Sequence, residues 1–175
     1  MRSTLLLLLL AGFGGPLSAQ RERVVIVIPE QITRVVADTM GTPIAYDAPP
    51  RLVFQALVKV YESLDVPVTL KDSVEGKVGN LKFHKSGRLG GQQISAFLSC
   101  GDGVTGPNAD SYRVYMALRS VVVPSGENGS ILRSTLFGGA MNVAEGARQA
   151  MPCESNGRFE ILIGKLVQAR LDAPF

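Results

Sequence analysis

Residues 112–119 read Tyr-Arg-Val-Tyr-Met-Ala-Leu-Arg, and this stretch decides the fold. Its even-numbered positions are apolar or aromatic, whereas two of the odd-numbered positions are arginines. A period of two is typical of a β-strand that buries one face. Residues 124–129, Pro-Ser-Gly-Glu-Asn-Gly, are turn formers, and residues 131–141 predict a returning strand. The sequence therefore predicts a long hairpin.

Three segments on either side of this hairpin have helical periodicity. The first is residues 50–64, at whose start lie Pro49 and Pro50, and a first helical turn tolerates proline. A short helix is expected over 92–100, and a closing helix over 156–170 begins at a cap supplied by Ser155 or Asn156. The apolar residues that recur at three-four spacing are Val53, Leu57, Val60 and Leu64, then Ile94, Phe97 and Leu98, then Phe159, Leu162, Ile163, Leu166 and Val167.

Further strands are expected over 66–70 and 78–84, with a turn at 71–73 between them. The β-branched run 24–28 and residues 32–38 form either two strands or one bent strand. Hairpins interspersed with helices indicate an α+β domain, an antiparallel sheet with two main helices and one short helix packed on one face.

The first 19 residues have the layout of a cleaved secretory signal peptide. A positive start precedes the apolar run 5–10, Gly and Pro break that run, and small residues lead to a cut after Ala19. The alternative is a membrane anchor, but the run is shorter than the ~20 apolar residues that a span requires. We expect no membrane span after cleavage and no lipid anchor, because no cysteine follows the cut. The mature chain is then one domain, residues 20–175, in the periplasm or secreted.

Two cysteines, Cys100 and Cys153, lie in the mature chain. An even pair in an exported protein indicates a structural disulfide, and two buried free thiols are the alternative. A disulfide between them closes a loop of about 50 residues, which corresponds to about 4 kcal/mol of stabilisation in the chain-entropy estimate. The expected bridge ties the short helix to the closing helix.

Composition excludes several classes of protein. The 175 residues are 46% hydrophobic and 19% charged, which excludes a disordered chain. Loss of Arg2 with the leader leaves 17 basic against 15 acidic side chains, a net charge of +2. This excess is too small to indicate a nucleic-acid partner.

Residues 101–106, Gly-Asp-Gly-Val-Thr-Gly, match the G-x-G-x-x-G string of dinucleotide sites. Such a site needs a strand before it and a helix after it. Here the expected order is reversed, so we interpret the string as a surface loop. Asp102, Asn108 and Asp110 lack calcium-loop spacing and are expected to make turns and caps, with a weak calcium site as the alternative.

No catalytic constellation is visible. There is no G-x-S-x-G elbow, and the one histidine, His84, lies in an expected strand between Lys82 and Lys85. We expect a solvated strand histidine, no enzyme activity, no cofactor and no metal site. Carboxylates that converge only in the fold remain an alternative.

Two basic features are candidate partner-binding surfaces. The first is the segment 71–88, in which basic side chains exceed acidic ones by three. Lys82 and His84 are expected to face outward from its strand. The second is the polar face of the strand over 112–119, with Arg133 of the returning strand nearby. The candidate residues are Lys82, Lys85 and Arg88 in the first feature and Arg113, Tyr115 and Arg119 in the second.

The order of the elements 50–64, 66–84, 110–141 and 156–170 resembles the helix-grip arrangement of accessory proteins of the bacterial outer-membrane barrel assembly machinery. The chain also resembles the small exported proteins of unknown function in bacterial envelopes. The resemblance rests on element order over about 120 residues and implies no particular site residue. It implies an envelope location. The basic residues predict a protein or anionic envelope component as the partner.

These observations favour an exported, non-catalytic binding or structural domain of the cell envelope. One alternative is a carrier that holds a small apolar ligand between the sheet and the helix over 53–64. The other is a hydrolase whose carboxylates meet only in three dimensions.

Overall fold

The computed structural model describes residues 24–28, 31–35 and 41–173. The predicted signal peptide, residues 1–19, lies outside the described residues, and so does the end of the predicted strand 32–38. None of the described helices is long and apolar enough to cross a membrane.

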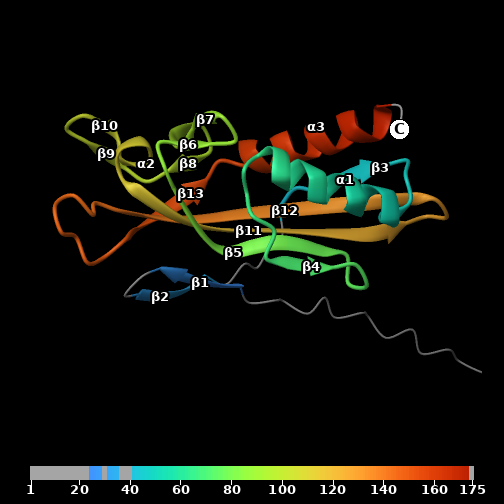
Figure 1. The fold of residues 1–175 in the computed structure, drawn as a ribbon, viewed down its shortest axis with the longest axis horizontal. Helices are drawn as coiled ribbons and strands as arrows, with labels where there is room; N and C mark the ends of the chain where they lie inside the picture. The colour runs from blue at the N-terminus through green and yellow to red at the C-terminus, as the bar shows by residue number, and fades with distance from the viewer. Residues whose placement is uncertain (1–23, 29–30, 36–40, 174–175) are drawn as a thin grey trace, which may run out of the picture.

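A long antiparallel hairpin forms the centre of the fold (Figure 1). Strands β11 (Arg113–Ser125) and β12 (Gly129–Met141) pair along their whole length, from Arg113 opposite Met141 to Ser125 opposite Gly129. The predicted hairpin is therefore confirmed. Alternation also sets its faces, because Val114, Met116 and Leu118 are all at most 1% exposed.

The remaining strands complete a seven-stranded sheet around this hairpin. Strand β5 (Lys77–Ser86) pairs with the other edge of β11, and β4 (Leu70–Asp72) pairs with the start of β5. Two strands share the free edge of β12 at its opposite ends, β3 (Ile44–Tyr46) and β13 (Met151–Ser155). Strand β8 (Leu98–Ser99) extends the sheet beyond β13.

Helices α1 (Pro50–Ser63) and α3 (Arg158–Asp172) lie side by side on one face of the sheet, as Figure 1 shows. We call this the inner face, and the opposite face the outer face. The apolar spacing of both helices is confirmed, since their buried residues include Val53, Leu57 and Phe159. The α+β class with helices on one face of an antiparallel sheet is thus observed.

The space between the sheet and the helices is filled with side chains. Those below 2% exposure include Leu57 and Tyr61 of α1, Leu132 and Leu136 of β12, and Phe159 of α3. They belong to one continuous apolar cluster. Within it Phe97 packs edge-on against Phe159, with the two ring centroids 4.9 Å apart. This packing gives no support to a ligand chamber between the sheet and α1.

The start of α3 differs from the expected cap. Gly157 occupies the N-cap position with a positive φ of 79°, a conformation that glycine adopts without steric cost. Ser155 is the last residue of β13, and the Asn156 side chain accepts a hydrogen bond from the Arg158 N–H at 3.1 Å. Only Asn156 and Gly157 therefore separate β13 from α3.

The predicted helix over 92–100 was too long. The chain instead forms β6 (Arg88–Leu89), β7 (Gln92–Gln93), a 3-10 turn η1 (Ile94–Ala96) and then β8. Gly90 and Gly91 have positive φ and close the β6–β7 hairpin. So short a helix nucleates poorly, and residues 98–99 gain more by pairing with β13.

The boundaries of two other predicted segments also differ from those in the structure. The predicted strand over 66–70 is wrong except at its end, because Pro67 offers no N–H and pairing starts with β4 at Leu70. The expected loop over 101–110 contains a small hairpin, β9 (Asp102–Gly103) with β10 (Gly106–Pro107), and then a one-turn helix, α2 (Asn108–Ser111). The G-x-G-x-x-G string therefore lies on an exposed hairpin, with Val104 at its fully exposed tip.

At the N-terminal end of the described chain, β1 (Val24–Ile28) and β2 (Gln31–Val35) form a separate antiparallel pair. The β-branched region is therefore two strands. β1 lies against β5, β11 and β12, on the side away from the helices in Figure 1.

Candidate partner-binding surface

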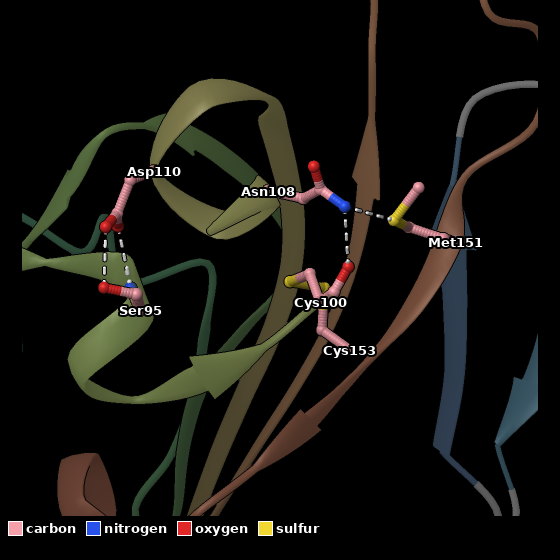
Figure 2. Close-up of a disulfide and its surroundings, with 6 residues drawn as sticks. All are labelled: Ser95, Cys100, Asn108, Asp110, Met151 and Cys153. Atoms are coloured by element: carbon pink, nitrogen blue, oxygen red, sulfur yellow. Dashed lines mark hydrogen bonds between the residues drawn. A yellow bond between two sulfur atoms is a disulfide. The ribbon is translucent and has the colours of Figure 1, made fainter. Parts of the chain in front are cut away.

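The predicted disulfide joins Cys100 to Cys153, with their Cα atoms 4.3 Å apart (Figure 2). Leu98 pairs with Ser155 and Ser99 with Glu154, so the two cysteines are the next facing pair of the same ladder. The bridge therefore joins two neighbouring strands, and the prediction that it joins two helices was wrong. Such a disulfide persists in an oxidising compartment.

Hydrogen bonds order the chain beside the disulfide (Figure 2). Asn108 donates to the Cys100 carbonyl at 3.3 Å and approaches the Met151 sulfur at 3.5 Å. The Asp110 carboxylate accepts from the Ser95 N–H at 2.8 Å and from its hydroxyl at 2.6 Å. Among the described residues no three His, Cys, Asp or Glu side chains group as metal ligands. Asn108 and Asp110 therefore join neighbouring segments of this region, rather than acting only in local turns and caps.

Parts of the two candidate surfaces adjoin, because β5 and β11 are neighbours in the sheet. Their register sets His84 beside Tyr115, and the two ring centroids are 5.7 Å apart. Arg113 is exposed two residues before Tyr115, and Lys82 is exposed at a bulge two residues before His84. We call Lys82, His84, Arg113 and Tyr115 the β5–β11 surface.

An apolar patch adjoins the β5–β11 surface on the outer face. Leu81, Tyr115, Ala150 and Phe137 of β12 are partly buried and pack against the fully buried Ala117. No carboxylate of the described chain pairs with Lys82 or Arg113. This end of the outer face therefore offers an aromatic ring and two cations beside half-buried apolar side chains.

The structure separates the other three predicted residues from this surface. Lys85 forms an ion pair with Asp65, directly after α1, and Arg88 donates to the Gly91 carbonyl within its own hairpin at 2.8 Å. Arg119 is only 7% exposed, so the expectation that it lies on an exposed strand face was wrong. Alternation set its side correctly, and β1 lies against β11 on that side of the sheet.

Sequence reasoning missed a chain of hydroxyls buried on the inner face. The Tyr61 hydroxyl lies 2.9 Å from the Ser120 hydroxyl, which lies 2.6 Å from that of Ser134. Burial raises the pKa of Tyr61 above its ordinary value of 10, and the hydrogen bond with Ser120 opposes part of this rise. Position 120 is even-numbered, like the buried positions 114, 116 and 118, so the alternation could have predicted that Ser120 points toward the inner face.

Sequence reasoning also missed Glu160, a buried carboxylate in the first turn of α3. One oxygen accepts from the Leu136 N–H at 3.0 Å and from the Ser155 hydroxyl at 2.9 Å, while the other has no partner in the described chain. Leu136 lies in the part of β12 between the β3 and β13 pairings, so Glu160 satisfies an otherwise free strand edge. These contacts are structural.

No protein-family model matches the sequence, and comparison with curated proteins finds no similar chain.

Proposed function

We propose that the protein is an exported binding domain of the bacterial cell envelope that recognises an acidic partner protein through the β5–β11 surface. The observation that carries this proposal is the register that sets Tyr115 beside His84, with the exposed cations Lys82 and Arg113 on either side. The signal-peptide pattern and the disulfide support export. The proposal also agrees with the envelope location that the helix-grip resemblance implies, which stays a prediction.

The residue types on this surface are those that dominate protein interfaces. Tyrosine and arginine are enriched among the residues that lose the most binding energy when truncated, because each combines a large apolar area with a polar end. A partner carboxylate at Arg113 forms a charge-assisted, two-pronged hydrogen bond, while the partner's apolar side chains cover Tyr115 and Phe137. Exposed charges also accelerate encounter with an acidic partner, more strongly at low salt.

The direct test is photo-crosslinking in the native host. A photoreactive phenylalanine analogue replaces Tyr115, and a matched control carries it at Lys165, an exposed position on α3. We expect a discrete adduct from position 115 and none from position 165. Adding Arg113→Glu should abolish the adduct because it reverses the charge beside the crosslinker, while circular dichroism confirms an unchanged fold.

Adducts of equal yield from both positions would contradict the proposal, since they would indicate random collision. The absence of any adduct from position 115, or an adduct that is insensitive to Arg113→Glu, would contradict it as well.

A further inference from the structure

Two adjoining grooves follow the exposed side of α1, away from the β5–β11 surface. The larger, about 510 Å³, lies between α1, Lys71 of β4 and the end of α3 at Arg170 and Leu171. The smaller, about 360 Å³, continues from the first turn of α1 to the turn after β4. Phe54, Gln55 and Lys71 line both grooves, so the two are continuous.

The floor of the grooves is apolar. Leu52 and Ala56 of α1 and Leu171 of α3 are partly exposed along the larger groove. At the rim of the smaller groove Val74 is 92% exposed, one of the most exposed large apolar side chains of the described residues. Partly exposed apolar side chains therefore form the floor of the larger groove, between the polar residues of its rim.

The rim of the grooves is positively charged. Arg51, Lys71 and Arg170 line it, and none of them pairs with a carboxylate of the described chain. Glu62, the acid that lines the larger groove, already pairs with Lys59 at 3.0 Å, and Asp72 beside Lys71 accepts the N–H groups of Val74 and Glu75. The three cations thus have no carboxylate partner within the described chain. An anionic ligand can supply the missing negative charge.

We propose that this groove binds a small anionic amphiphile, a molecule with one phosphate or carboxylate head and an apolar chain. Its volume lies in the range of small-molecule sites, which combine a largely apolar lining with a few polar groups that fix orientation. Lys71 stands where the two grooves meet, so it is placed to bind the head. The apolar chain then lies over Leu52, Ala56 and Leu171.

The test is a titration of the full mature protein with decyl phosphate below its micelle concentration, followed by calorimetry and by amide NMR shifts. Inorganic phosphate and decyltrimethylammonium are the matched probes for the head and the chain alone. We expect saturable binding of decyl phosphate only, with shifts confined to α1, β4 and the end of α3. Lys71→Glu should weaken the affinity about tenfold or more, since a charge-assisted contact is lost.

Matched variants separate the groove from general surface effects. Ala56→Trp should block binding by filling the larger groove, whereas Ala169→Trp, on the exposed side of α3, should not. Lys165→Glu is the charge control for Lys71→Glu and should change the affinity less than about twofold. The Tyr115 crosslink should survive Lys71→Glu, so failure of this inference is distinguishable from failure of the proposed function.

Four results would overturn the inference. Equal binding of inorganic phosphate means that the rim holds only an ion, and equal binding of decyltrimethylammonium means that charge plays no part. Binding solely in a variant that ends at Ala173 means that residues 174–175 occupy the groove. A dimer in sedimentation that Lys71→Glu dissociates means that the occupant is a second copy of the chain.

Discussion

The two faces of the central sheet differ in what their side chains do. On the inner face, β11 contributes Val114, Met116 and Leu118, all buried in the main apolar cluster. On the outer face the same strand contributes Arg113 and Tyr115, which stay accessible beside Lys82 and His84. One alternating strand therefore supplies both the stability of the fold and the proposed binding surface, and substitutions on the two faces should have separable effects.

The disulfide belongs to the inner face, because Cys100 is part of the main apolar cluster and Cys153 packs against it. Replacing both cysteines by serine should lower the free energy of unfolding by about 4 kcal/mol, since the 53-residue connection is no longer closed in the unfolded chain. Urea denaturation measures this loss, and the wild type in reductant should show a loss of similar size. A change below about 1 kcal/mol would show that the bridge is not structural.

A leucine-to-alanine pair compares the faces directly. Leu118→Ala removes a fully buried inner-face side chain and should cost about 3 kcal/mol, from lost transfer energy and the cavity left behind. Leu81→Ala, on the partly exposed outer face, should cost about 1 kcal/mol. Equal losses in urea denaturation would contradict the division between the faces.

Glu160 tests a polar contact on the inner face. Glu160→Ala should cost about 2 kcal/mol, because it leaves the buried Leu136 N–H without its acceptor. The matched variant Glu154→Ala, at an exposed position of β13, should change the free energy of unfolding by less than about 0.5 kcal/mol. Retained stability in Glu160→Ala would mean that water replaces the carboxylate at the strand edge.

The buried tyrosines predict a loss of stability at alkaline pH. Burial raises the pKa of Tyr46 to about 12 and raises that of Tyr61 as well, so the folded state favours the neutral phenol. Their contribution is fully present below pH 10 and is lost as the pH rises through the folded-state pKa. Tyr61→Phe should therefore reduce the drop in unfolding free energy between pH 8 and pH 11 by about 1.4 kcal/mol. An unchanged drop would show that Tyr61 ionises in the folded protein.

The sequence predicts the inner face well because its signals are local. The parity of β11 and β12, the three-four spacing in α1 and α3, and the pairing of the only two cysteines all follow from neighbours in the chain. The same parity extends to Ser120, although its partner Tyr61 lies 59 residues away and only the fold brings them together.

The mistakes concern pairing between distant segments. Strand β13 has no alternation of its own and is held by residues 138–140 of β12, and β8 is extended because it pairs with β13. Arg119 is buried although its neighbours in the sequence predict exposure. The union of β5 and β11 into one surface likewise required the register between His84 and Tyr115. None of these contacts produces a pattern of hydrophobic residues in the sequence of the segment, so periodicity cannot predict them.

The most direct test of the division between the faces is the free energy of unfolding of the double variant Lys82→Glu, Arg113→Glu. Both cations are exposed and lack a carboxylate partner in the described chain, so urea denaturation should give a value within about 0.5 kcal/mol of the wild type. A loss of about 2 kcal/mol or more would show that these cations hold the fold together, which would contradict their assignment as a surface kept for a partner.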